Sequence, residues 1–210
     1  PMADGPTIQR ASERALAAGM SMRKVLDIVR SFRATGDQTP VVLMGYANPI
    51  EAMGYETFAV KAKASGVDGI LIVDYPPEES VEWVQQLDRH GIDAIFLLSP
   101  TTPEARIEQV AKLAKGYIYY VSLKGVTGAS HLDLQDVSAM VARLRQSITI
   151  PIGVGFGIRD GATAKAVADL ADAVVVGSRI IEEIEQSPSA ELLSNVGNFL
   201  HGLRKSVDGH

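Results

Sequence analysis

The stretch at residues 148–181, ITIPIGVGFGIRDGATAKAVADLADAVVVGSRII, decides the fold of this chain. It contains two short apolar runs, at 150–155 and 173–177, which are rich in β-branched residues and too short for surface helices. Such runs predict buried strands. Each run ends in glycine, and helices are expected directly afterwards at 161–171 and 179–183. Consecutive strand–helix units of this kind are typical of a parallel sheet.

The glycine turns between these strands and helices predict a phosphate site. Glycine leaves backbone N–H groups uncovered, and the positive end of a helix dipole attracts an anion. Asp160 can cap the first helix, and Gly177-Ser178 opens the second. Two such turns on successive units predict one phosphate held from both sides, after the last two strands of a barrel. Alternatively Gly155, Gly157 and Gly177 only form tight turns; the pairing of the turns favours phosphate.

The composition narrows the class of protein. At 210 residues with 46% hydrophobic residues, the chain is expected to form a single domain over 1–210. A net charge of −5 without a basic run argues against nucleic-acid binding. The absence of cysteine excludes disulfides and thiolate sites and is compatible with the cytoplasm. The four histidines are scattered, so no metal site is predicted. No apolar span reaches 18 residues, and no membrane association is expected.

The strand–helix pattern recurs along the whole chain. Strands are expected to begin near residues 41, 69, 93, 117, 150 and 173, with helices between them. A closed (β/α)8 TIM barrel needs eight strands and about 250 residues. The chain opens on Pro1 without an initiator Met, so we expect an N-terminally truncated barrel that lacks its first two strands. An open doubly wound sheet is the competitor, but the dinucleotide fingerprint is not met after Gly153 or Gly155.

Chemistry in a parallel barrel belongs to the carboxyl ends of the strands and the loops after them. This rule selects a short set of candidate residues, to which Asp4 is added because its loop precedes the first expected helix. The set is Asp4, Tyr46, Asn48, Asp74, Ser99, Tyr119, residues 122–128, Phe156, Gly157, Gly177 and Ser178.

Several of these candidates have a structural alternative. Asp4 has two possible roles. Its carboxylate is either stabilised by the dipole of the helix that follows, or it lies in the site and stabilises a positive charge that develops during the reaction. Asp74 either caps the next helical region or meets a partner. Alternation places Tyr117 and Tyr119 on one face of their strand, and a tyrosine facing the barrel interior needs a polar partner. The long loop at 122–131 is either a lid over a phosphate ester or an exposed loop.

Five motifs, taken together, resemble the tryptophan synthase alpha chain family. The likeness runs in register from Pro1 to about Leu203. The motifs are Pro1-Met-Ala-Asp-Gly-Pro-Thr-Ile-Gln9, Met44-Gly-Tyr-Ala-Asn-Pro49, Gly125-Val-Thr-Gly128, Gly155-Phe-Gly-Ile158 and Gly177-Ser178.

The resemblance implies a lyase that splits indole-3-glycerol phosphate into indole and glyceraldehyde 3-phosphate by retro-aldol cleavage. It implies Asp4, Tyr119 and Thr127 as catalytic residues, with Thr127 closing the lid by bonding Asp4. The remaining roles are phosphate binding by Gly128, Phe156, Gly157, Gly177 and Ser178, an indole pocket formed by Ile8, Tyr46 and Leu71, and a partner-facing rim formed by Pro1, Asn48 and Asp74.

The resemblance also implies an αββα complex with a beta chain that carries pyridoxal phosphate and receives indole, whereas the alpha chain needs no cofactor. The family's second catalytic carboxylate, a glutamate at the end of its second strand, would lie before Pro1, so we expect this chain to turn over little. Two alternatives stay open: a non-catalytic barrel that binds a phosphorylated ligand and modulates a partner, and an indole-glycerol-phosphate synthase. The latter would need a catalytic lysine on a strand, and Lys124 lies in a loop.

Overall fold

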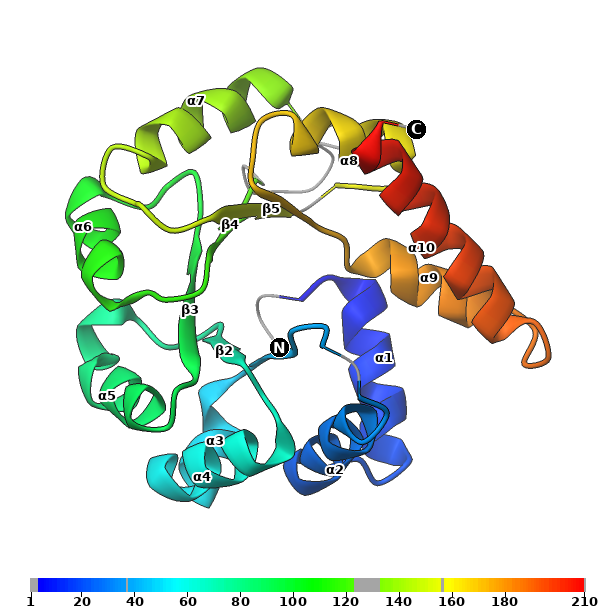
Figure 1. Ribbon diagram of the computed structural model, residues 1–210, viewed down its shortest axis with the longest axis horizontal. Coiled ribbons are helices and arrows are strands. Elements are labelled where there is room, and N and C mark those ends of the chain that lie inside the picture. Colours follow the sequence, from blue (N-terminus) through cyan, green and yellow to red (C-terminus); the bar gives the residue numbers. More distant parts are fainter. Residues whose placement is uncertain (1–3, 37, 123–132, 156, 210) are drawn as a thin grey trace.

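Six parallel strands form one curled sheet with helices outside it (Figure 1). The computed structural model describes residues 4–36, 38–122, 133–155 and 157–209. Each strand pairs in parallel with the next along the chain. The strands are β1 (Val42–Gly45), β2 (Gly69–Ile72), β3 (Asp93–Leu98), β4 (Ile118–Val121), β5 (Ile152–Gly155) and β6 (Ala173–Val175). All six predicted strands are confirmed, and the order is that of a parallel (β/α) barrel.

Helices follow or precede the strands along the whole described chain. None of those in the described ranges is long and apolar enough to cross a bilayer. They are α1 (Pro6–Ala17), α2 (Met22–Arg33), α3 (Ala47–Met53), α4 (Tyr55–Ser65), α5 (Val81–Arg89), α6 (Glu104–Leu113), α7 (Leu134–Leu144), α8 (Gly161–Ala168), α9 (Ser178–Gln186) and α10 (Leu192–Asp208), with a 3-10 turn, η1 (Pro77–Glu79).

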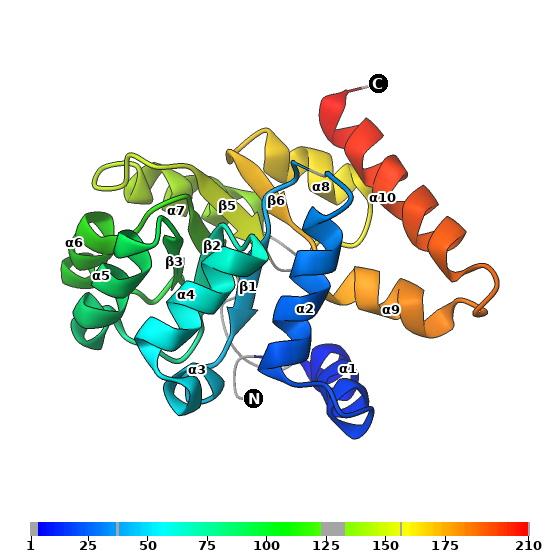
Figure 2. The ribbon, with the colours of Figure 1, turned by 60° about the horizontal axis from the view of Figure 1, so that its bottom comes forward.

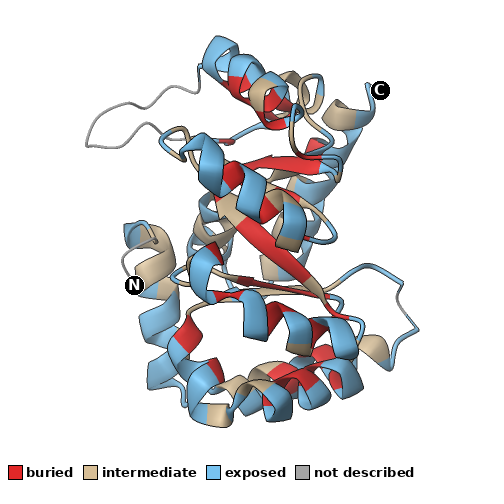
Figure 3. Ribbon diagram, turned by 90° about the vertical axis from the view of Figure 1, so that its left-hand side faces the viewer, coloured by how far each residue is buried: buried red, intermediate tan, exposed pale blue. Residues whose placement is uncertain are grey.

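The main core lies between the outer face of the sheet and the helices. Ile118 and Tyr120 of β4 and Ile152 and Val154 of β5 are buried in it, facing helices such as α7 and α8. Figure 3 shows the buried residues along the strands and the inner sides of the helices. Burying one such aliphatic side chain stabilises the fold by about 1.5–3 kcal/mol. This layer therefore fixes the positions of the strand ends.

The barrel interior is filled by tyrosines that face glycines. A Cβ placed on Gly155 would lie 2.4 Å from the Tyr119 ring, and one on Gly153 would lie 3.5 Å from Tyr117. Tyr117 and Tyr119 therefore face the interior, while Ile118 and Tyr120 face the helices, as the alternation predicted. The glycines of β5 make room for two aromatic rings.

The sheet is open between β1 and β6. Within the described residues, β1 pairs only with β2 and β6 only with β5. The ring of helices nevertheless closes at this place, because α1 packs against α9 (Figures 1 and 2). Glu185 of α9 forms ion pairs with Arg14 at 2.6 Å and Arg10 at 3.3 Å. The fold thus matches six strands of an eight-stranded barrel.

Candidate active site

The two glycine turns lie at the same rim of the barrel. Gly155 of β5 pairs with Val175 of β6, and Gly157 and Gly177 each lie two residues beyond these paired positions. Gly157 has a φ of +77°, which other residues rarely adopt. Gly177 is exposed and is the N-cap of α9, so the first N–H groups of that helix lack helical acceptors. Such turns can bind an anion.

Asp160 caps α8, as the sequence predicted. Its carboxylate accepts hydrogen bonds from the backbone N–H and the hydroxyl of Thr163, both at 2.8 Å. The backbone bond, followed by the hydroxyl bond, lowers the pKa of Asp160. The cap fixes the direction of the chain after the Gly157 turn.

Asp4 lies at the same rim and is held by Tyr46. The Tyr46 hydroxyl donates a hydrogen bond to Asp4 Oδ2 at 2.9 Å, and the side-chain amide of Gln9 donates to the Asp4 backbone carbonyl at 2.7 Å. Tyr46 directly follows β1, so its position marks the carboxyl end of that strand. Asp4 is half-buried. The sequence selected Asp4 and Tyr46 separately but did not predict their hydrogen bond or the role of Gln9.

Tyr119 supplies a second polar group from the barrel interior. Burial, and then the neighbouring Tyr117, raise the pKa of the Tyr119 hydroxyl. The phenol therefore stays protonated throughout the neutral range and can act as a hydrogen-bond donor. Leu71 of β2 is buried but lies outside the outer core, which places it on the interior face, and Ile8 of α1 is half-buried.

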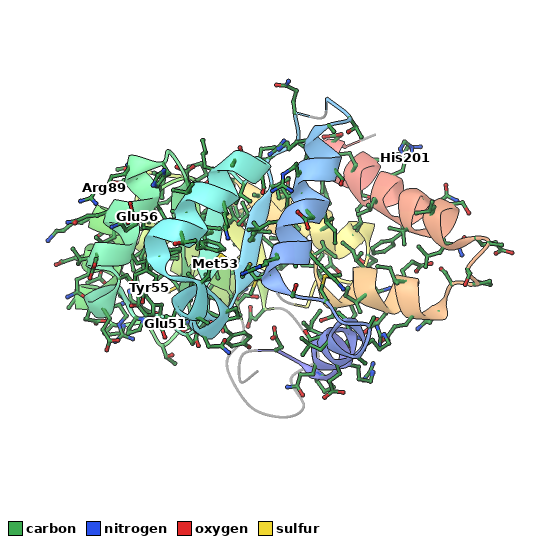
Figure 4. The ribbon with its side chains drawn as sticks, turned by 90° about the horizontal axis from the view of Figure 1, so that it is seen from below. Glu51, Met53, Tyr55, Glu56, Arg89 and His201 are labelled. Carbon is green, nitrogen blue, oxygen red and sulfur yellow. The ribbon has the colours of Figure 1, made fainter. Side chains whose placement is uncertain are left out.

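Asp74 caps a helix, but not the one that the sequence suggested. Its Oδ1 accepts a hydrogen bond from the N–H of Ala47, the first residue of α3, at 2.8 Å. Asp74 therefore stabilises the start of α3, which lies earlier in the chain, and not the helical region that follows Asp74. The adjacent Tyr75 is fixed by a 2.5 Å contact between its hydroxyl and that of Tyr55. Tyr55 also donates to Glu51 at 3.1 Å, and Figure 4 shows both on α3 and α4.

The other predicted site residues are either exposed or outside the residues that the structure describes. Asn48 is exposed in the first turn of α3, and Ser178 is exposed as the first residue of α9. Pro1, Thr127, Gly128 and Phe156 lie outside the described residues. The loop before Thr127 starts from a fixed point that sequence reasoning missed, because the N–H and hydroxyl of Ser122 both donate to the Gly155 carbonyl, at 3.1 and 3.0 Å.

A cavity of about 610 Å³ in the described structure lies away from this rim. It lies beside β6, between α8 and α10. The polar groups gather instead at the carboxyl rim, where parallel barrels perform chemistry. Fold and rim together define a member of the (β/α)-barrel class with its candidate site at the carboxyl ends of the strands.

The sequence profile of the tryptophan synthase alpha chain matches residues 1–202. This chain belongs to the tryptophan synthase alpha chain family, a family of lyases in tryptophan biosynthesis. The tryptophan synthase alpha chain of Nitrosospira multiformis is 67% identical over 208 residues, covering 99% of this chain and 75% of that relative.

Solved structures agree with the family. Tryptophan synthase subunit alpha from Legionella pneumophila is 42% identical, with a TM-score of 0.92 over 100% of this chain and 78% of that one. A chain of the tryptophan synthase α2β2 complex from Pyrococcus furiosus is 35% identical, with a TM-score of 0.87 over 97% of this chain and 82% of that one. The expected barrel class is confirmed.

Proposed function

We propose that this chain acts as the alpha subunit of tryptophan synthase and cleaves indole-3-glycerol phosphate to indole and glyceraldehyde 3-phosphate. Family membership supports the reaction. The observation that carries the residue assignment is the hydrogen bond from Tyr46 to Asp4, at the rim that also holds the glycine turns. This geometry brings a carboxylate and two glycine turns, whose N–H groups are suited to an anion, to one end of the barrel.

The cleavage needs two proton movements. Carbon 3 of the indole accepts a proton, and the hydroxyl on the adjacent glycerol carbon loses one. The carbon–carbon bond then breaks, its electrons return to the ring, and the former hydroxyl carbon becomes the aldehyde. Protonation of carbon 3 creates positive charge at the indole nitrogen, and the carboxylate of Asp4 stabilises that charge. The hydroxyl of Tyr46 orients this carboxylate.

The other roles are those that the family resemblance implies. The protonated hydroxyl of Tyr119 donates into the pocket, and Thr127 closes the lid by bonding Asp4. The apolar side chains of Ile8 and Leu71, with the Tyr46 ring, enclose the indole. Phosphate binding, which supplies energy to position the reacting bond, falls to Gly128, Phe156, Gly157, Gly177 and Ser178.

We also propose a beta chain as the partner, as in the α2β2 complex of Pyrococcus furiosus. Pro1, Asn48 and Asp74 form the rim that faces it, and the exposure of Asn48 and Asp74 supports this placement. The beta chain carries pyridoxal phosphate and receives indole, and the alpha chain requires no cofactor of its own. Both act in the cytoplasm.

The 210-residue chain alone turns over slowly in this proposal. The resemblance implies a second catalytic carboxylate, a glutamate, in a segment before Asp4 that this sequence does not include. A general acid or base contributes about 10²–10⁴-fold to a rate. Loss of this group leaves Asp4 without the residue that moves the protons.

The test restores that segment. This chain is joined behind the corresponding segment of the Nitrosospira multiformis relative, giving what we call the joined protein. Indole release is measured with and without beta chain, for the joined protein, its Asp4→Asn variant and the 210-residue chain. We expect turnover by the joined protein, and at least a hundredfold loss in the variant and in the short chain. Full activity of the Asp4→Asn variant, or none in the joined protein, contradicts the proposal.

A further inference from the structure

Ser122 holds the carbonyl group from which the turn after β5 starts. Its backbone N–H and its hydroxyl both donate to the Gly155 carbonyl oxygen, at 3.1 and 3.0 Å. Val121 and Gly155 are the last paired residues of β4 and β5, so the N–H bond continues the parallel ladder by one step. The hydroxyl bond is an addition that the ladder does not require. A carbonyl oxygen has two lone pairs and can accept both bonds.

The backbone of Gly155 is also restrained from the barrel interior. A Cβ built on Gly155 would lie 2.4 Å from the Tyr119 ring, so this ring lies directly against the glycine backbone. Gly155 itself is buried. The ring on one side and Ser122 at the carbonyl together fix the direction in which the chain leaves β5.

The turn that contains Gly157 is therefore fixed at both ends. Ser122 holds its start, and the Asp160 carboxylate holds its end by capping α8 through the N–H of Thr163 at 2.8 Å. Between these two points Gly157 adopts a φ of +77°. A binding group that is ordered before the ligand arrives binds with less entropic cost.

Ser122 lies behind the rim and not in the barrel interior. With Tyr120, Asp136 and Met140 it lines a cavity of about 200 Å³ on the outer side of β4, beside α7. Figure 1 shows β4 next to β5 with α7 outside them. Because the Ser122 side chain is on this outer side, it acts on an anion at the rim through the Gly155 backbone and not by direct contact.

We propose that Ser122 is a positioning residue for phosphate binding, because its hydroxyl fixes the Gly155 carbonyl and thereby orders the Gly157 turn. The inference rests on the phosphate site of the proposed function. The residues that the family resemblance assigns to the phosphate do not include Ser122. One neutral hydrogen bond of this kind changes an equilibrium by about three- to tenfold.

The first part of the test needs no ligand. Amide NMR shifts and order parameters of Gly157 and Gly177 are compared in the unchanged chain, Ser122→Ala and Ser122→Thr. We expect Ser122→Ala to shift the Gly157 amide and lower its order parameter, while Gly177, which follows β6, stays unchanged. Ser122→Thr keeps the hydroxyl, and the cavity of about 200 Å³ has room for its methyl group, so this variant should restore the Gly157 signal. An unchanged Gly157 amide in Ser122→Ala overturns the inference.

The second part adds glycerol 3-phosphate. Ser122→Ala should weaken its binding by about three- to tenfold, and Ser122→Thr should stay within about twofold of the unchanged chain. Binding that Ser122→Ala leaves unchanged, or a loss that Ser122→Thr does not restore, overturns the role of Ser122 alone. Absence of binding by the unchanged chain and by the joined protein overturns the phosphate site of the proposed function as well.

Ser194→Ala is the matched control. The Ser194 hydroxyl also donates to a backbone carbonyl, that of Glu191 at 2.8 Å, but it is exposed on α10. This variant should leave the Gly157 amide and the binding of glycerol 3-phosphate unchanged. Ser122→Ala retains the ladder bond of its N–H, so its thermal unfolding should stay close to that of Ser194→Ala. Equal losses of binding in Ser122→Ala and Ser194→Ala would overturn the inference.

Discussion

At the scale of single residues, the Tyr46 hydroxyl connects β1 to the Asp4 loop. A hydrogen bond to a charged acceptor contributes about 1.5–3 kcal/mol. Tyr46→Phe in the joined protein should therefore lower kcat/KM for indole release by about ten- to a hundredfold. Tyr55→Phe removes a hydroxyl from the Tyr55–Tyr75 pair and is the matched control, expected to stay within twofold. An equal loss in both variants would show that the Asp4 contact has no special role.

Gly155 illustrates how close packing shapes the interior. A Cβ at this position lies 2.4 Å from the Tyr119 ring, whereas a Cβ at Gly153 has its nearest neighbour at 3.5 Å. Overpacking of this kind costs about 1–3 kcal/mol. Gly155→Ala should thus lower the free energy of unfolding by this amount in urea titrations, and Gly153→Ala should have a much smaller effect. Identical midpoints for the two variants would contradict the packing described.

The sequence could select candidate site residues but could not predict their contacts. Asp4 and Tyr46 were selected because each lies beside a strand end or a helix start, which is a local property. Their hydrogen bond depends on how a loop before α1 meets the end of β1, 42 residues away. No local sequence pattern predicts a contact between residues so far apart in the chain. The hydrogen bond between Gln9 and the Asp4 carbonyl is likewise not predicted by a local pattern.

At the scale of elements, the Asp160 cap gives a pH-dependent prediction. Folding lowers the pKa of Asp160, so the unfolded chain binds more protons at acid pH. The stabilisation is complete above the ordinary carboxyl pKa near 4 and is lost as pH falls through the lower folded-state pKa. Asp160→Ala should cost about 1 kcal/mol at pH 7.

Asp160→Asn is the matched variant, because asparagine keeps a cap acceptor without titrating. Urea unfolding is measured from pH 7 to pH 3 for both variants and the unchanged chain. The unchanged chain should lose stability relative to Asp160→Asn as the pH falls. Parallel pH profiles would show that the carboxylate is not the acceptor that matters for α8.

Helices were predicted where their signals are local. The Asp160 signal correctly predicts the start of α8, but no local signal predicts a helix over residues 47–53. The structure has α3 there instead, because Asp74, distant in sequence, caps Ala47, and Pro49 is tolerated in a first helical turn. A helix whose capping group is distant in sequence cannot be predicted from its own residues.

At the scale of the whole molecule, the repeated strand–helix pattern predicted a parallel barrel, because this period is set by each unit alone. Ile28 of α2 is apolar but 57% exposed. The helical periodicity of α2 shows which apolar residues lie on one face of the helix. It does not show what packs against that face, because this depends on how the sheet closes.

The central claim is that the turns after β5 and β6 bind one phosphate group at the rim that holds Asp4. The most direct test is a titration of the chain with glycerol 3-phosphate, followed by the amide NMR shifts of Gly157, Gly177 and Ser178. The account predicts that all three shift together with a single Kd, which Asp4→Asn leaves unchanged. Shifts at one turn only, or at neither, would contradict it.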